Sequence, residues 1–165
     1  MRIYVFCYVM MLFLCSCKES AKQEIYNESN TTVINGVVYD IDEKPINGLY
    51  KVYYPDGKVK MEIMSKHGKP NGEGKFYAES GELLYSATFR KGIIDGKVYN
   101  YFADGAIRNE MNYKNGKMHG LQKTFDEDMT LAIEITYDKG KPIKGFAIIN
   151  GQKIDFSAEE LAKIK

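Results

Sequence analysis

The segment YFADGAIRNEMNYKNGKMHG, residues 101–120, contains the strongest signals for the fold of this chain. Asp104-Gly105 and Asn115-Gly116 are dipeptides that favour tight turns, and apolar and polar residues alternate between them, as is typical of a half-buried strand. The stretch from Tyr113 to Gly120 is therefore interpreted as a boundary between two strands. A phosphate-binding loop is excluded, because these glycines lead into a strand and not into the N-terminus of a helix.

The same pattern recurs every 24 residues, so the chain is interpreted as four copies of one unit. The glycine columns are Gly48, Gly72, Gly96 and Gly120; Gly68, Gly92, Gly116 and Gly140; and Gly57, Gly81 and Gly105, with Met129 in the fourth place. The aromatic column is Tyr53, Tyr77, Tyr101 and Phe125, and the aliphatic column is Val59, Leu83, Ile107 and Leu131. This predicts an all-β fold: an elongated antiparallel meander of about four 24-residue hairpin repeats, near residues 48–71, 72–95, 96–119 and 120–144, with a short C-terminal helix.

The segments that flank the repeats extend this domain to residues 32–165. Residues 32–39 and 146–156 each place Asn-Gly between β-prone runs, which predicts one more hairpin at either end. Ser157 and Glu160 have the spacing of a capping box, so a short helix is expected to complete the C-terminal segment 145–165. Its apolar residues Leu161 and Ile164 are expected to cover the last edge of the sheet.

The N-terminus reads as a targeting segment. Residues 1–16 combine a basic start with an apolar run too short to span a bilayer. Leu-Cys-Ser-Cys, residues 14–17, resembles the lipobox of bacterial lipoproteins, which implies cleavage between Ser16 and Cys17 and acylation of Cys17, with palmitate among the acyl groups. An uncleaved membrane anchor and an ordinary secretory signal remain the alternatives. Residues 17–31 are polar and aperiodic, and are expected to form a flexible tether.

This interpretation places the domain in the cell envelope, held by a lipid anchor, with the outer membrane favoured if the bacterium has two membranes. After loss of the signal and acylation of Cys17, the mature chain has no free thiol, so we expect no disulfide, zinc site or cysteine nucleophile. Of the 23 Lys and Arg residues, Arg2 leaves with the signal, and the remainder balance the 22 Asp and Glu residues. No nucleic-acid partner is expected of a neutral body, and no metal or cofactor is predicted.

The histidines and the glutamates do not form a recognisable catalytic set. His67 and His119 lie in columns that vary between repeats, so they are interpreted as solvated loop residues, with a role as ligand or base as the alternative. Glu62, Glu110 and Glu134 share a column that could bind a cation or a basic partner. A mutually compensated face is favoured instead, because Lys60 and Arg108 lie two residues away. No catalytic residue is assigned.

Four further aromatic residues vary in phase from the fixed aromatic column. They are Tyr50, Tyr54, Tyr99 and Phe102. Tyrosine-rich surfaces often bind partners, so these residues form the candidate binding surface. The alternative, that they complete the packing of a thin sheet, is equally well supported.

The pattern resembles the MORN repeat, and more closely its bacterial variant in YwqK-type antitoxins. The matching stretches include YYPDGKVKMEI at residues 53–63, YFADGAIRNEMNYKNGKMHG at 101–120 and TYDKGKPIKG at 136–145. Met129 in place of a turn glycine and Ser65 in place of a boundary aromatic depart from the pattern. The resemblance implies a non-catalytic module that binds or scaffolds proteins. Its narrower implication is an antitoxin or immunity role, in which the unknown protein partner would be a toxin. The alternative from another class is an envelope enzyme acting on polysaccharide or lipid.

Overall fold

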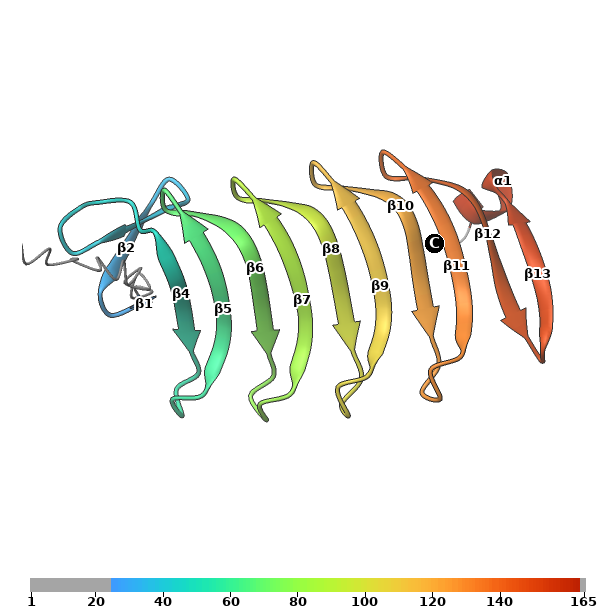
Figure 1. The fold of residues 1–165 in the computed structure, drawn as a ribbon, viewed down its shortest axis with the longest axis horizontal. Coiled ribbons are helices and arrows are strands. Elements are labelled where there is room, and N and C mark those ends of the chain that lie inside the picture. Colours follow the sequence, from blue (N-terminus) through green and yellow to red (C-terminus); the bar gives the residue numbers. More distant parts are fainter. Residues whose placement is uncertain (1–24, 164–165) are drawn as a thin grey trace, which may run out of the picture.

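The computed structural model describes residues 25–163 and is built from one long sheet (Figure 1). This sheet has 11 strands in the order β1-β4-β5-β6-β7-β8-β9-β10-β11-β12-β13, and β2 and β3 form a separate two-stranded sheet. The strands are β1 (Ile25–Asn27), β2 (Thr31–Ile34), β3 (Val37–Asp40), β4 (Gly48–Tyr53), β5 (Val59–Lys66), β6 (Lys69–Tyr77), β7 (Leu83–Arg90), β8 (Ile93–Tyr101), β9 (Ile107–Lys114), β10 (Lys117–Phe125), β11 (Leu131–Asp138), β12 (Lys141–Ile149) and β13 (Gln152–Ser157). The predicted antiparallel meander is confirmed from β4 to β13.

The turns follow the glycine columns. At one side of the sheet, His67, Lys91, Asn115 and Lys139 have φ between 49° and 52° and each precedes a glycine with positive φ. Two successive residues with positive φ make the turn whose twist matches an antiparallel hairpin. At the other side, Gly57, Gly81 and Gly105 also have positive φ, and Met129 adopts φ 66° in the fourth place. The fourth repeat therefore keeps its turn without the glycine.

The apolar face of the sheet holds the core. One row of paired residues runs across the strands through Tyr50, Ile63, Gly74, Ala87, Val98 and Met111. Ile46, just before β4, is 0% exposed and packs in the same cluster as Tyr50 and Ile63. A second cluster joins Ala87, Val98 and Met111. The core therefore passes from one hairpin to the next instead of closing within a single repeat.

The N-terminal boundary of the domain differs from the prediction. The sequence predicts a flexible tether over residues 17–31, but Ile25–Asn27 forms β1 and pairs in parallel with β4, and Thr31 begins β2. The reason is packing, since Tyr26 lies against the core cluster around Ile46, where an aromatic ring can bury a large apolar area. The predicted signal peptide, its cleavage site and Cys17 lie outside the described residues.

The C-terminal helix is confirmed, but its position is not the expected one. α1 (Ala158–Lys163) is capped as predicted, because Glu160 Oε2 accepts bonds from the amide of Ser157 at 2.8 Å and its hydroxyl at 2.7 Å. Leu161 is 7% exposed, and α1 packs mainly on β12 at the upper end of the sheet (Figure 1). Ile164, which was expected to share this role, lies outside the described residues. Within residues 25–163, the outer side of β13 stays unpaired. No described helix has the length and apolar character needed to cross a membrane.

Candidate functional site

The polar face of the sheet carries a row of mostly charged side chains, here called the charged row. Strand pairing aligns its members across neighbouring strands: Lys51, Glu62, Lys75, Ser86, Tyr99, Glu110, Lys123 and Glu134. Glu62 lies 3.3 Å from Lys51 Nζ, and Glu110 lies 2.6 Å from Lys97 Nζ. The glutamate column is thus interleaved with lysines from adjacent strands.

Compensation of the glutamates was predicted correctly, but from the wrong residues. Lys60 and Arg108 lie over the rings of Tyr54 and Phe102, at 5.7 Å and 5.9 Å from the centroids. Neither basic residue has a partner on the neighbouring strand. Met61 and Val59 pair with consecutive residues of β4, so Lys60 between them is left unpaired. Arg108 is left unpaired in the same way between β8 and β9. An unpaired extra residue of this kind is a β-bulge, which redirects side chains. The bulge breaks the alternation on which the prediction depended.

Glu62 is the most constrained carboxylate of the charged row. Burial opposes its ionisation, but hydrogen bonds from the Tyr77 hydroxyl, at 2.9 Å, and from Lys51 outweigh burial, so the pKa of Glu62 is lowered. Burial and the same bond to Glu62 raise the pKa of Tyr77 to about 12. Glu62 is therefore held as an anion, and a free general acid at this position is not supported.

The candidate binding aromatics divide between the two faces. Tyr50 is 9% exposed and lies in the core, so it completes the packing and is not an exposed contact residue. Tyr54 donates its hydroxyl to the carbonyl oxygen of Tyr77 at 2.7 Å. The rings of Tyr99 and Tyr101 lie 6.4 Å apart. Tyr54, Tyr99 and Phe102 are half-buried, and each also lies beneath a cation from Lys60, Lys97 or Arg108.

The repeat columns that contain His67 and His119 have a structural role that the sequence pattern did not reveal. Asn47 and Asn71, which share the column of His119, accept bonds from the turn amides of His67 and Lys91 at 2.9 Å and 3.3 Å. His119 Nδ1 instead lies 3.1 Å from Asp138 Oδ1. The signal was the recurrence of a side-chain acceptor 20 residues before a positive-φ turn residue, which becomes meaningful only once the hairpins are stacked.

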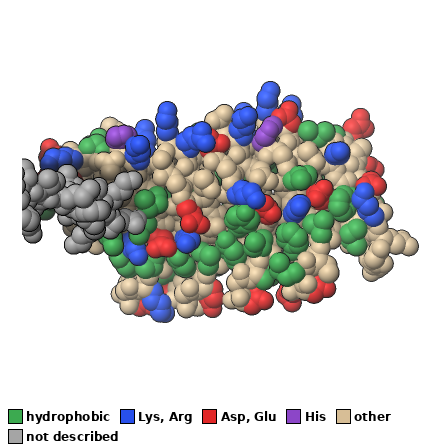
Figure 2. Space-filling model, viewed as in Figure 1, with side chains coloured by type: hydrophobic (Ala, Val, Ile, Leu, Met, Phe, Trp, Pro, Cys, Tyr) green, Lys and Arg blue, Asp and Glu red, His purple; other side chains and the backbone are tan. Residues whose placement is uncertain are grey.

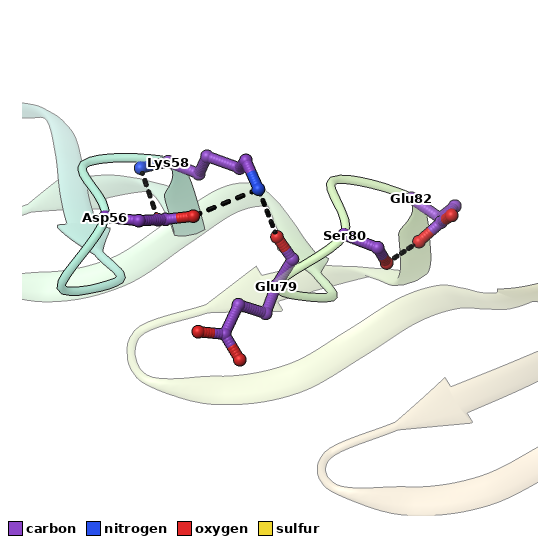
Figure 3. Close-up of polar contacts among 5 residues, drawn as sticks. All are labelled: Asp56, Lys58, Glu79, Ser80 and Glu82. Atoms are coloured by element: carbon purple, nitrogen blue, oxygen red, sulfur yellow. Dashed lines mark hydrogen bonds and ion pairs between the residues drawn. The ribbon is translucent and has the colours of Figure 1, made fainter.

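The turns at the lower ends of the hairpins form an acidic edge. It comprises Asp56, Glu79, Glu82, Asp104, Asp126, Glu127 and Asp128. Several of these carboxylates shape their own turns, since Asp56, Asp104 and Asp128 each accept the amide two residues later at 2.9–3.0 Å. Figure 3 shows that Lys58 also links two repeats: its Nζ lies 3.0 Å from Asp56 Oδ2 and 2.9 Å from the carbonyl oxygen of Glu79, whose carboxylate points away.

The turns at the upper ends form a basic edge. It comprises Lys66, Lys69, Arg90, Lys91, Lys114, Lys117, Lys139 and Lys141, all exposed. Figure 2 shows Lys and Arg gathered along the upper turns and Asp and Glu along the lower turns. Among residues 25–163, no lysine of the basic edge has an ion-pair partner. The near-neutral net charge thus conceals a separation of charge across the width of the sheet.

The turns of the basic edge are held at a regular spacing by hydrogen bonds, and a cavity lies between two of them. Each upper turn donates a glycine amide to a carbonyl of the preceding repeat: Gly68 to Ile46 at 2.9 Å, and Gly92 to Pro70, Gly116 to Ile94 and Gly140 to Met118 at 2.8 Å. A cavity of about 450 Å³ lies between the last two turns and is lined by Lys114, Asn115, Lys117, His119 and Lys139. This cavity, together with the basic edge, is the candidate site. Residues 25–163 contain no group of His, Cys, Asp or Glu arranged to hold a metal ion.

Three consecutive segments of the chain match the MORN repeat variant, at residues 46–67, 70–91 and 94–115. The comparison with curated proteins gives no significant match. The matched segments coincide with the hairpins β4–β5, β6–β7 and β8–β9, and the hairpin β10–β11, which carries Met129, continues the same sheet beyond them. Residues 46–115 are therefore similar to three consecutive repeats of the MORN variant.

Proposed function

We propose that the protein is a non-catalytic binding module that receives an acidic surface of a partner protein on its basic edge. The observation that carries the proposal is the row of exposed lysines without ion-pair partners in the described part of the chain, set at a fixed spacing by the glycine-to-carbonyl bonds between repeats. Exposed charges arranged in this way steer an oppositely charged partner and select against a basic one. Glu62 and Glu110 of the charged row, by contrast, are already bound by lysines and, for Glu62, by Tyr77.

A repeat array suits this task because its surface is extended. Consecutive turns on one edge are separated by two strands, or roughly 10 Å, since neighbouring strands lie about 4.8 Å apart. Four basic turns thus form a line on the order of 30 Å long. A partner that presents acidic groups along a helix or a strand can contact several turns at once, which gives affinity without a deep pocket.

The module is proposed to act in the cell envelope, held there by acylation of Cys17. Its narrower role, which follows only from the resemblance to YwqK-type antitoxins, is neutralisation of a toxin by surface contact. That role is tested by co-expression with a toxin-like protein from a neighbouring reading frame: growth restored by the chain supports immunity, and unrelieved toxicity contradicts it.

The experiment that tests binding uses three versions of the full-length chain, purified in mild detergent, as bait for envelope proteins. Lys69→Glu/Lys114→Glu/Lys117→Glu reverses part of the basic edge. Glu79→Lys/Asp126→Lys/Glu127→Lys reverses part of the acidic edge at carboxylates that bond no turn amide. An acidic partner that is retained by the wild type and the second variant but lost with the first supports the proposal.

Two results would contradict the proposal. Equal retention by all three baits would place the contact elsewhere on the chain. Turnover of an envelope polysaccharide or lipid that is lost in Glu62→Gln or Glu110→Gln would assign the protein to the enzymatic alternative.

A further inference from the structure

β13 is one of the two terminal strands of the sheet, and no described element pairs with its outer edge. β13 pairs with β12 on one side only, and the residues described provide no strand for its other side. In Figure 1, β13 is the outermost strand, and α1 lies toward β12 at its upper end. An open strand of this kind offers unpaired amides and carbonyls to another strand.

The hairpin turn determines which residues direct their backbone outward. Asn150 and Gly151 have φ 52° and 74° and form a two-residue loop between Ile149 and Gln152. In such a turn the carbonyl of the first flanking residue accepts the amide of the last, so Ile149 and Gln152 form a hydrogen-bonded pair. Because hydrogen-bonded and non-hydrogen-bonded pairs alternate along an antiparallel ladder, Ile154 also bonds β12. Lys153 and Asp155 then direct their amides and carbonyls to the open side.

These two outward residues carry opposite charges. Lys153 Nζ lies 2.8 Å from Asp155 Oδ1 on the polar face, and it also lies 4.5 Å from the centre of the Phe146 ring. Ile154 between them lies on the apolar face, where it is 41% exposed. A second copy of β13, placed antiparallel and centred on Ile154, would therefore set each Lys153 opposite an Asp155.

We propose that two copies of the chain associate through β13, antiparallel and centred on Ile154, so that the two sheets become one. In this register Lys153 of each copy faces Asp155 of the other as a hydrogen-bonded pair, in which both residues exchange amide-to-carbonyl bonds. Ile154 faces its own copy at a non-hydrogen-bonded pair, where side chains approach most closely. The two-fold axis keeps polar face beside polar face and apolar face beside apolar face.

Charge selects this register over its neighbours. Only residues whose amides and carbonyls point to the open side can pair across the interface. In the two-fold registers that meet this condition, the sum of the two paired residue numbers therefore changes in steps of two. The adjacent registers place Lys153 against Lys153 or Asp155 against Asp155, and like charges directly opposite each other destabilise a sheet. The contact is short, so a reversible dimer is expected rather than a permanent one.

The test is a charge exchange in the full-length chain, purified in mild detergent with its thiols reduced and followed by sedimentation equilibrium. Asp155→Lys and Lys153→Asp alone should each weaken dimerisation about tenfold or more, because each replaces two attractive pairs with two repulsive ones. The double variant Lys153→Asp/Asp155→Lys restores complementary pairs and should dimerise as the wild type does. Circular dichroism establishes that every variant keeps the strand signal.

The register is tested separately by Ile154→Cys under mild oxidation in the same detergent. A disulfide-linked dimer that is absent from the parent chain, which keeps its own cysteines, supports a centre at residue 154. A wild-type chain that stays monomeric at every soluble concentration, or single variants that dimerise as the wild type does, would overturn the proposal.

Discussion

The hydroxyl of Tyr77 donates a 2.9 Å hydrogen bond to Oε1 of Glu62 and so joins the fixed aromatic column to the charged row. One repeat later, the hydroxyls of Tyr101 and Ser86 lie 3.0 Å apart in the same relationship. In the next repeat Phe125 has no hydroxyl to offer, and Glu110 is bound by Lys97 instead. The aromatic column therefore packs between repeats and, at Tyr77 and Tyr101, also forms hydrogen bonds with the charged row.

Tyr77→Phe tests how much the Tyr77 hydroxyl contributes to the free energy of unfolding and how this contribution depends on pH. The pKa of Tyr77 is raised from 10.0 to about 12 in the folded protein, so the fold favours the neutral phenol. Its contribution to stability is fully present below pH 10 and is lost as the pH rises through about 12. We expect Tyr77→Phe to cost about 1 kcal/mol at pH 8.

The measurement is urea unfolding of both chains at pH 8 and pH 11, and the difference between them should shrink at the higher pH. Tyr101→Phe is the matched control, because its partner Ser86 is uncharged. A difference between wild type and Tyr77→Phe that is constant across this range would show that burial and the bond to Glu62 do not favour the neutral phenol.

Replacement by alanine should destabilise the protein much more at one turn glycine than at another. Gly116 has φ 75° and a Cβ there meets nothing within 4 Å, so Gly116→Ala should cost only the backbone strain, on the order of 1 kcal/mol. Gly68 has φ 69°, but its Cβ would lie 2.5 Å from the carbonyl oxygen of Val38. Gly68→Ala should cost about 1 to 3 kcal/mol more, because β3 must move. Equal urea midpoints for the two variants would contradict the close docking of β3.

The capping box of α1 should be measurable at one residue. The Ser157 hydroxyl lies 3.4 Å from the amide nitrogen of Glu160, while the Glu160 carboxylate accepts the Ser157 amide. Ser157→Ala should destabilise the helix by about 1 kcal/mol, seen as faster amide exchange in residues 158–163. Ser157→Thr, which retains the hydroxyl as both donor and acceptor, should restore most of the protection. Loss of protection across the whole sheet in Ser157→Ala would mean that the helix and the sheet unfold as one unit.

Anchoring is tested at Cys17. If this cysteine is acylated, Cys17→Ser should move the protein from the membrane fraction to the soluble fraction after cell lysis, because the lipid is the anchor. Cys15→Ser, two residues earlier, is the control and should leave the protein at the membrane. A Cys17→Ser chain that stays with the membrane would support an uncleaved anchor.

The repeat, its turns and the class of the fold could be predicted from the amino-acid sequence. These are local signals: Asp104-Gly105 and Asn115-Gly116 favour turns through their own backbone preferences, and alternation between them reports a half-buried strand. The box at Ser157 was readable for the same reason, because a helix cap lies within four residues. Recurrence every 24 residues then turned one hairpin into an array.

Which residues contact one another could not be predicted, because these contacts depend on how the strands pair and pack. The bulges at Lys60 and Arg108 change the face to which the following residues belong, and a bulge depends on the register with a second strand. Tyr50 is buried because Ile46 and Ile63 pack against it, which no local pattern reports. The separation of charge has the same origin: net charge is a sum over the chain, whereas a meander places every second turn on the same edge and so collects lysines on one side and carboxylates on the other.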